Sequence, residues 1–351
     1  MKKIFCTALA LLTTLSLAAC GAKPSTAPAS SAAPSSASSS SPATTGKTVE
    51  IKIATVGNES HQSTIGAQFF KDKVEELSNG QIKVTIYPNG ALGGEREAAE
   101  GVKLGTLQMT IVTTDGALPA WVPETQVLSI PYLFANKEEA YKTLDELLQP
   151  ELAPKFEAQG FKHLGFMELG FRHFTNNKRE VKTAEDMKSL SIRVQEAPIW
   201  FALIEKLSAT ATPVAFNELY TALQQGMVDG QENPITSIAT SRFNEVQKYM
   251  TLDGHTYAAE SVIINKAFYD GLTPDQQKNI DDAAAYAVAE QRKKVDSQEA
   301  EYLKQLKDSG MVVTEPDLAS FRTATDGLYK MESVTKLVDP TLVEKIMDFL
   351  K

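Results

Sequence analysis

The sequence predicts an α/β protein whose sheet is parallel or mixed and carries helices on its faces. Two kinds of segment alternate along the chain. In one kind polar and apolar residues alternate, which is the pattern of strands, and in the other apolar residues recur at helical spacing. About 300 residues follow the N-terminal leader, which is enough chain for two domains. A long helix with few large apolar residues is expected near the end of the chain, and such helices often bridge two domains.

Strands and helices alternate from the start of the folded region. Residues 64–77 carry apolar side chains at helical spacing and are followed by Asn79-Gly80, a signal for the end of a helix. Pro88-Asn89-Gly90 marks the next turn. The region is predicted to be β-α-β-α-β, with its other elements over residues 49–56, 81–87, 95–104 and 107–112.

The same alternation continues through the middle of the chain. Helices are predicted over residues 137–148, 198–207 and 218–225, and strands over 161–169, 190–194, 228–231 and 261–264. The long helix is expected to begin at Thr273-Pro274-Asp275 and to run to about Asp308, because Thr273 is a suitable N-cap and Pro274 is favoured in the first turn.

The first 48 residues predict export and a lipid anchor. Two lysines precede the nearly uncharged segment 4–19, which is too short for a membrane span of about 20 residues and is typical of a secretory signal. The segment ends in Leu-Ala-Ala-Cys20-Gly, which resembles a bacterial lipobox with Cys20 as the lipidated residue; an ordinary cleavage site is the alternative. The linker 20–48 is almost entirely Gly, Ala, Ser, Thr and Pro, a composition that predicts a disordered tether with a reach of roughly 30 Å.

Composition excludes several classes of protein. The only cysteines are Cys6 and Cys20, so the exported domain has no disulfide and no thiolate nucleophile. Without the two lysines of residues 1–19, 33 basic side chains face 44 acidic ones, and a chain this acidic is not a general binder of polyanions. No other stretch of 18 apolar residues follows the leader.

No enzyme motif is found in the sequence, and neither a cofactor nor a metal is expected. The four histidines form no H-E-x-x-H and no pair at metal-ligand spacing, and G-x-S-x-G, the P-loop and G-x-G-x-x-G are all missing. The glycines of residues 90–94 are interpreted as a strand-to-helix turn, because the Lys-Ser/Thr ending of a phosphate loop is lacking. A glycosidase needs only two carboxylates, and the sequence selects no such pair.

Four ordered motifs lie between residues 170 and 234. They are Gly-Phe-Arg172-His-Phe-Thr-Asn-Asn, Ser-Ile-Arg193-Val, the segment 213–226 and Val-Asp-Gly-Gln-Glu-Asn233-Pro. Together they closely resemble the solute receptors of TRAP transporters, the DctP-like family of tripartite ATP-independent periplasmic systems. Weaker features of that family stand at residues 92–96 and 130–134, and the resemblance extends from about Val49 to Lys351.

The resemblance implies a fold and a function. The fold is the two-domain cleft of periplasmic binding proteins with a long hinge-spanning helix, and the domains are expected over 49–170 with 258–298 and over 171–257 with 299–351. The function is that of a non-enzymatic receptor, lipid-anchored outside the cell membrane, which binds a small organic acid and delivers it to the membrane permease. A sensor for a histidine kinase and a surface hydrolase are the competing hypotheses, and a monomer is expected.

Arg193 is the residue that the resemblance implies pairs with the ligand carboxylate. A guanidinium offers a planar fork of donors that fits a carboxylate, and the end of a strand is where open α/β sheets bind ligands. Its neighbours Ile192 and Val194 are expected to face the opposite side of the strand. Charge-assisted hydrogen bonds contribute about 1.5–3 kcal/mol each, so Arg193 alone gives at best millimolar to sub-millimolar binding.

Other contacts carry over from the family, each beside a simpler alternative. Arg172 matches a second ligand-facing arginine or forms a structural salt bridge, and Asn233 binds the ligand or caps the next helix. Phe216 packs on the carbon skeleton of the ligand or is ordinary core. Glu95 contacts polar groups of the ligand or is a surface acid at a helix start, and His61 holds a position where many members place a polar residue of the cleft.

Departures from the sialic-acid receptors of the family narrow the ligand. Val56, Thr113 and Gly116 stand where those receptors place an Asn, a Glu and a nearby Arg, so several contacts for a nine-carbon sugar acid are missing. The hydroxyls of Thr113 and Thr114 together with two arginines suit a hexuronate, an aldonate or a dicarboxylate. A sugar acid is favoured, with a C4-dicarboxylate as the alternative.

Overall fold

The computed structural model describes residues 48–351. The predicted signal peptide, the lipidation site Cys20 and the linker up to Lys47 lie outside these residues. Within the described range no helix combines the length and the apolar composition needed to cross a membrane. The description below concerns the compact unit that ends at Lys351.

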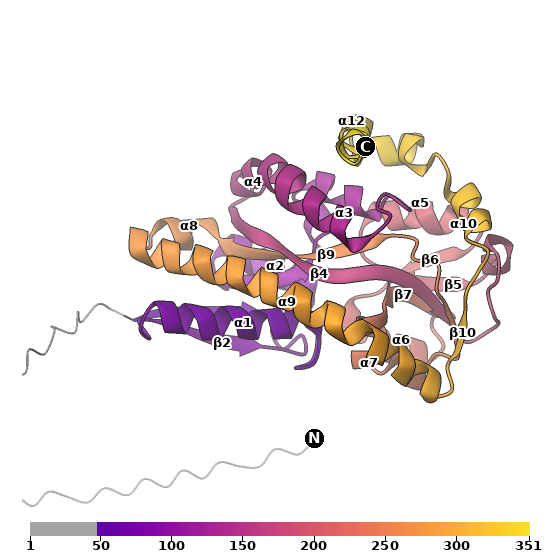
Figure 1. The fold of residues 1–351 in the computed structure, drawn as a ribbon, viewed down its shortest axis with the longest axis horizontal. Helices are drawn as coiled ribbons and strands as arrows, with labels where there is room; N and C mark the ends of the chain where they lie inside the picture. The colour runs from indigo at the N-terminus through magenta and orange to yellow at the C-terminus, as the bar shows by residue number, and fades with distance from the viewer. Residues whose placement is uncertain (1–47) are drawn as a thin grey trace, which may run out of the picture. The chain divides into compact units, whose positions relative to one another are not determined.

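The described residues contain a mixed sheet with helices on both faces, which confirms the predicted α/β class (Figure 1). Its main path runs β2-β1-β3-β9-β4-β7-β5-β6; off this path β8 pairs with β4, and β10 pairs with β8. The strands are β1 Val49–Ala54, β2 Ile82–Tyr87, β3 Met109–Thr113, β4 Phe161–Asn176, β5 Ser191–Val194, β6 Thr210–Pro213, β7 Gly230–Pro234, β8 Tyr249–Thr251, β9 Tyr257–Asn265 and β10 Val312–Thr314.

The helices connect these strands and cover the sheet. They are α1 Gln62–Leu77, α2 Glu95–Leu104, α3 Lys137–Lys142, α4 Gln149–Ala158, α5 Pro198–Lys206, α6 Phe216–Gln224, α7 Ile235–Thr240, α8 Lys266–Asp270, α9 Pro274–Asp308, α10 Leu318–Thr325, α11 Glu332–Thr335 and α12 Pro340–Phe349. A π-helical segment, Thr143–Leu148, joins α3 to α4, so the helix predicted to end at 148 continues to Ala158.

Strand β4 belongs to both halves of the sheet, of which one contains β1, β2, β3 and β9 and the other contains β5, β6, β7, β8 and β10. Residues Phe161 to Phe171 pair antiparallel with β9, whereas Arg172 to Asn176 pair with β7. The strand was predicted to end at residue 169, but it continues to Asn176 through two register shifts. Gly165 and Gly170, with φ of 147° and 121°, lie at these shifts, where glycines are typical of a bulge within a continuing strand. The consequence is that Arg172 is a strand residue and not a loop residue.

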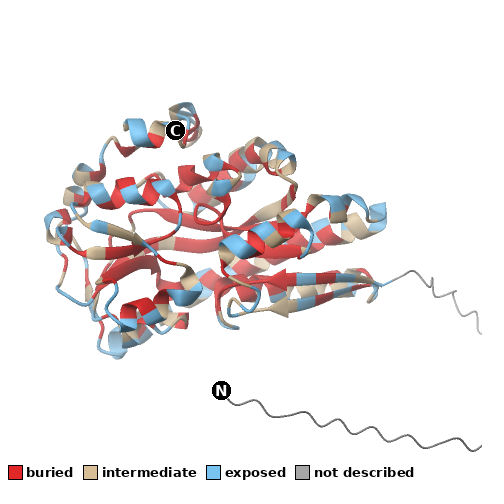
Figure 2. Cartoon of the chain, turned by 180° about the vertical axis from the view of Figure 1, so that it is seen from behind, coloured by how far each residue is buried: buried red, intermediate tan, exposed pale blue. Residues whose placement is uncertain are grey.

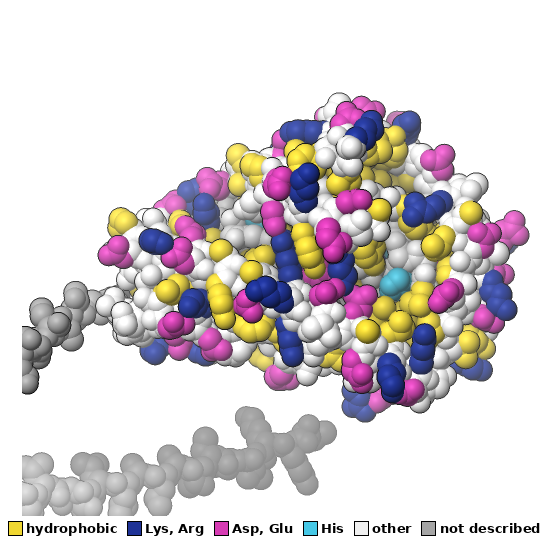
Figure 3. All heavy atoms as spheres, viewed as in Figure 1, with side chains coloured by type: hydrophobic (Ala, Val, Ile, Leu, Met, Phe, Trp, Pro, Cys, Tyr) yellow, Lys and Arg dark blue, Asp and Glu magenta, His cyan; other side chains and the backbone are white. Residues whose placement is uncertain are grey.

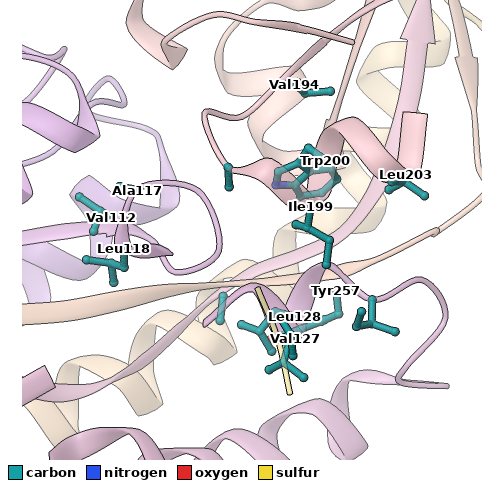
Figure 4. Packing of buried hydrophobic residues seen from close by; sticks show 14 of the residues in the cluster. Val112, Ala117, Leu118, Val127, Leu128, Val194, Ile199, Trp200, Leu203 and Tyr257 are labelled. Atoms are coloured by element: carbon teal, nitrogen blue, oxygen red, sulfur yellow. The ribbon is translucent and has the colours of Figure 1, made fainter. Parts of the chain in front are cut away.

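The two faces of the sheet bury different sets of side chains. Ile111 packs with α1 and α9, whereas its neighbour Val112 packs with α2, α4 and α5 on the other face, as strand alternation requires. Val262 and Ile263 divide in the same way. Figure 2 shows the buried strands between helices whose outer sides are exposed, and Figure 4 shows the packing around Trp200 and Tyr257. A third cluster joins α6, α7 and the C-terminal end of α9.

The long helix α9 lies along both halves of the sheet, beside α1 at one end and α7 at the other (Figure 1). It begins where the sequence predicted, and the side chains of Thr273 and Gln276 form a capping box. Near its middle, Gln291 bonds the backbone of Glu168 in β4 twice, with N···O distances of 2.8 and 2.7 Å. The helix is therefore attached to the strand that both halves share. The predicted domain boundaries themselves stay a prediction.

Candidate ligand-binding site

Two adjoining cavities lie where the carboxyl ends of parallel strands from the two halves of the sheet meet. This is the position at which open α/β sheets place ligands. The inner cavity is lined by Val56, His61, Glu95, Thr113, Leu169, Arg172, Arg193, Gln195, Phe216, Asn233 and Ser237. The outer cavity shares Glu95, Arg193, Gln195 and Phe216 with it and extends toward Arg96 and Glu196. All seven ligand-binding residues predicted from the sequence line the inner cavity.

Arg193 is a buried cation without a carboxylate partner among residues 48–351. It lies in β5 and is only 3% exposed, and its one hydrogen bond runs from Nε to the carbonyl of Val214 at 2.8 Å. Ile192 and Val194 belong to the hydrophobic core, so Arg193 faces the opposite side of the strand, as predicted. Burial lowers the pKa of Arg193 to about 10, and the guanidinium is charged at neutral pH. Its two Nη groups are therefore available to an anion.

Arg172 is also buried, but its guanidinium is already paired. Nε and Nη2 form an ion pair with the carboxylate of Glu232 in β7, and Nη2 also donates to the Glu232 carbonyl at 2.8 Å and to Oδ1 of Asn233 at 3.2 Å. Burial alone would lower the pKa of Arg172, but the adjacent Glu232 carboxylate outweighs this and raises it. The structural salt bridge considered from the sequence is thus present, although the side chain also lines the cavity. Only Nη1 has no partner among the described residues.

A second layer of charge lies behind Glu232. His255 places Nε2 3.5 Å from Glu232 and Nδ1 2.8 Å from Asp253, and its ring stacks on Phe174 at 4.3 Å. Burial favours the neutral imidazole, but the carboxylate of Asp253 prevails, with help from Glu232, and raises the pKa of His255 to about 9. His255 is therefore an imidazolium at neutral pH, and the chain of alternating charges fixes Glu232 and with it Arg172.

Glu95 supplies the acceptor side of the cavity. It is the first residue of α2, and its Oε1 accepts hydrogen bonds of 2.8 Å from both the amide and the hydroxyl of Thr113. Burial raises the pKa of Glu95, opposed by these bonds and by the two arginines. Glu95 is thus at a helix start, but it faces the cavity and not the surface. The Thr113 hydroxyl is used within the protein and offers a ligand only its lone pairs.

His61 and Phe216 lie side by side in the lining of the inner cavity. His61 is the N-cap of α1, and its ring lies 5.5 Å from the ring of Phe216. Its Nδ1 accepts from the Ser63 amide at 3.3 Å, and Nε2 lies 3.4 Å from the Ser237 hydroxyl. Burial lowers the pKa of His61 to about 4, so the imidazole is neutral. Phe216 begins α6 and is half-buried, packing on the third core cluster while presenting a face to both cavities.

Asn233 is a residue of β7 and does not cap the following helix. The N-cap of α7 is Pro234, which contradicts the capping alternative considered from the sequence. The amide of Asn233 instead donates to Gln231 at 2.5 Å and accepts from Arg172. Its side chain therefore holds the second arginine and at the same time lines the cavity.

Three polar residues at the site were not predicted, namely Gln195 and Ser237, which line the inner cavity, and Glu232, which pairs with Arg172. Glu232 stands beside Asn233 in the sequence, and no pattern indicated that it pairs with an arginine 60 positions earlier. Gln195 follows β5 two residues after Arg193, and strand alternation places i and i+2 on the same side, so this signal was present but unused. Among residues 48–351, no three His, Cys, Asp or Glu side chains are arranged to hold a metal ion. The arrangement is suited to binding a small anion.

The chain matches known proteins over most of its length. A family model for bacterial extracellular solute-binding proteins, family 7, matches residues 53–335. A solute-binding protein of Verminephrobacter eiseniae (strain EF01-2) is 41% identical over 266 residues, which cover 76% of this chain and 78% of the relative.

Solved structures agree with this match. A TRAP periplasmic solute-binding protein from Polaromonas sp JS666, bound to D-erythronate, is 38% identical with a TM-score of 0.81, over 85% of this chain and 98% of its own. The sugar-acid-binding protein DctPAm from Advenella mimigardefordensis, in complex with galactonate, is 31% identical with a TM-score of 0.83, over 87% and 98% of the two chains. The protein is therefore a member of family 7 of the bacterial extracellular solute-binding proteins, the non-enzymatic receptors of TRAP transporters that its sequence motifs resemble.

Proposed function

We propose that this protein captures a polyhydroxy monocarboxylic acid of the aldonate class and delivers it to the membrane permease of a TRAP transporter. The observation that carries the proposal is Arg193, a buried and charged guanidinium with no carboxylate partner among residues 48–351. A ligand carboxylate would supply that partner through the free Nη groups. Lipidation at Cys20 would hold the receptor at the outer face of the membrane.

The charges around the inner cavity favour one ligand carboxylate over two. Arg172 and Glu232 neutralise each other, which leaves Arg193 and Glu95 facing the ligand. A monocarboxylate pairs with Arg193 and leaves Glu95 to accept hydrogen bonds from hydroxyl groups. A dicarboxylate would bring its second negative charge into a buried space that already contains Glu95, and like charges in such a space repel strongly.

The charge needed for recognition is local and lies inside the molecule. On the surface shown in Figure 3, Lys and Arg side chains are interspersed with Asp and Glu, and neither sign forms a continuous patch on that face. Since the whole chain has a formal charge of −9, its long-range field repels anions. Affinity therefore depends on the buried contacts, and the two related receptors that hold D-erythronate and galactonate support an aldonate as the ligand.

We also infer that the receptor acts as a monomer. Leu342, Val343 and Ile346 of the C-terminal helix α12 are buried in the core of this chain. A helix whose apolar face is already covered has no need of a second subunit. Light scattering coupled to gel filtration is expected to give the mass of one chain.

Calorimetric titration of the exported domain with three acids and one neutral sugar alcohol tests the proposed ligand class. We expect D-erythronate and D-galactonate to bind more tightly than succinate, and the neutral sugar alcohol erythritol not to bind. Arg193→Ala should reduce aldonate affinity by about 2–5 kcal/mol, because it leaves a buried ligand charge unpaired. Arg322→Ala removes the same charge at an exposed position outside both cavities and should leave the affinity unchanged.

Two results would overturn the proposal. One is aldonate binding that survives Arg193→Ala, and the other is succinate binding tighter than either aldonate. Glu95→Gln, which keeps the acceptor for Thr113 and removes the charge, should narrow the gap between succinate and D-erythronate. Uptake of labelled aldonate by cells with and without the permease genes would separate transport from a sensing role.

A further inference from the structure

Gln195 occupies the passage between the two cavities. It follows the last residue of β5, is 5% exposed, and lines the inner and the outer cavity together with Arg193, Glu95 and Phe216. Its Nε2 is buried and makes no hydrogen bond with any of residues 48–351. A buried amide donor without a partner is unfavourable and uncommon in native proteins, so it calls for an explanation.

Gly116 provides the space in which the Gln195 amide lies. A Cβ atom added to Gly116 would come within 2.2 Å of Oε1 and 3.1 Å of Cδ of Gln195. The backbone of Gly116 does not require glycine through a left-handed φ, so the close approach of Gln195 is the reason for the missing side chain. Any larger residue at position 116 would push the amide out of the passage.

The passage combines an acceptor with a donor. Glu95 can only accept when it is ionised, whereas the amide of Gln195 donates, and both line the space next to Arg193. A hydroxyl group has one hydrogen to donate and lone pairs to accept, so one hydroxyl on the ligand chain can satisfy both residues. A chain carbon without a hydroxyl would leave the Gln195 donor unpaired and would give Glu95 no hydrogen bond beyond those from Thr113, and sites of this kind discriminate against such analogues.

We propose that Gln195, seated on Gly116, is a specificity residue that selects acids with a hydroxyl on the carbon chain over acids without one. The proposal rests on the proposed function, since Arg193 must first hold the carboxylate. It assigns to Gln195 the recognition of the chain and to Arg193 the recognition of the charge. The ligand then extends from the inner cavity through the passage toward the outer one.

Titrations with D-erythronate and with butanoate, two four-carbon acids that differ in their hydroxyls, test this assignment. Gln195→Met keeps the approximate length of the side chain and removes the donor. We expect it to raise the dissociation constant of D-erythronate about tenfold and to leave that of butanoate unchanged. The dissociation constant of butanoate divided by that of D-erythronate therefore falls about tenfold. The unliganded Gln195→Met protein should be at least as stable to heat as the wild type, because an unsatisfied buried donor has been removed.

Gly116→Ala is the second variant, and together with the double variant Gly116→Ala/Gln195→Met it forms a double-mutant cycle. Gly116→Ala should lower the same ratio by displacing the amide, and Gly116→Ala/Gln195→Met should be no worse than Gln195→Met alone, since both act on one group. Equal losses for D-erythronate and butanoate, or fully additive effects in the double variant, would overturn the role of Gln195. Those results leave the proposed function standing if Arg193→Ala still abolishes binding. A wild-type protein that does not prefer carboxylates over neutral ligands would overturn the proposed function itself.

Discussion

Two sides of the inner cavity each carry a buried arginine, and the two arginines differ in whether the protein itself pairs them. On the wall formed by β4 and β7, Arg172 is held by Glu232 and Asn233, and Glu232 is held in turn by His255. On the wall formed by β5, Arg193 has a single hydrogen bond to a backbone carbonyl. Both arginines are buried. The difference lies in whether the protein or a ligand completes the hydrogen bonding.

This difference assigns separate tasks to the two walls. Charges that are paired within the protein stabilise one arrangement of the strands and contribute little further attraction to a ligand. A buried charge that stays unpaired costs stability in the unliganded protein, and that cost is recovered when an anion binds. We therefore expect changes at the β4–β7 wall to affect folding first and changes at the β5 wall to affect binding first.

Arg172→Met gives the largest expected effect. The change removes the arginine partner of the buried Glu232 carboxylate and leaves it only His255, 3.5 Å away. Breaking a buried ion pair in this way destabilises a protein by about 3–5 kcal/mol. Denaturation by guanidinium chloride, followed by circular dichroism, measures the free energy of unfolding. Arg172→Met/Glu232→Leu removes both charges and should recover most of the loss, and a double variant as unstable as the single one would contradict the assignment of Arg172 to the scaffold.

His255 gives the same wall a dependence on pH. The pKa of His255 is raised from 6.5 to about 9, so the folded protein holds this proton more tightly than the unfolded chain does. The resulting stability is fully present below pH 6.5 and is lost as the pH rises toward 9, by about 3 kcal/mol in total. Unfolding measured at pH 6.5, 7.5, 8.5 and 9.5 should follow this decline.

His255→Gln separates this effect from other titrations. The variant should be less stable at pH 6.5 and nearly independent of pH up to 9. His61, His163 and His173 serve as internal controls, because burial lowers their pKa values to about 4, 3 and 4, and their stability contribution is lost only as the pH falls below 6.5. A wild-type protein whose stability rises between pH 6.5 and 9 would show that His255 is not an imidazolium in the fold.

Local sequence signals predicted most of the elements and seven residues that line the inner cavity, but not the network behind them. The start of α9 at Thr273-Pro274 follows from capping chemistry, and Arg193 follows from a motif and from strand alternation. The continuation of β4 beyond residue 169 was missed because Gly170 looks like a strand end when its partner strands are unknown. Glu232 was missed because Arg172 lies 60 residues away along the chain and only the folded sheet brings the two together. His255 stands two residues from Asp253, but no pattern indicated that it also lies 3.5 Å from Glu232.

Arg193→Met is the smallest expected change in stability, and it contrasts most directly with Arg172→Met. Burial lowers the pKa of Arg193 to about 10, which means that the fold disfavours its charge. Replacing it with Met removes this penalty and also one hydrogen bond to Val214, which contributes about 1 kcal/mol. The unliganded variant should therefore be as stable as the wild type or up to about 2 kcal/mol more stable, while aldonate binding is lost.

The same denaturation experiment, with and without D-erythronate, measures both effects. If Arg193→Met destabilises the unliganded protein as much as Arg172→Met does, then the two walls do not differ in the way that their hydrogen bonds indicate, and Arg193 is part of the scaffold.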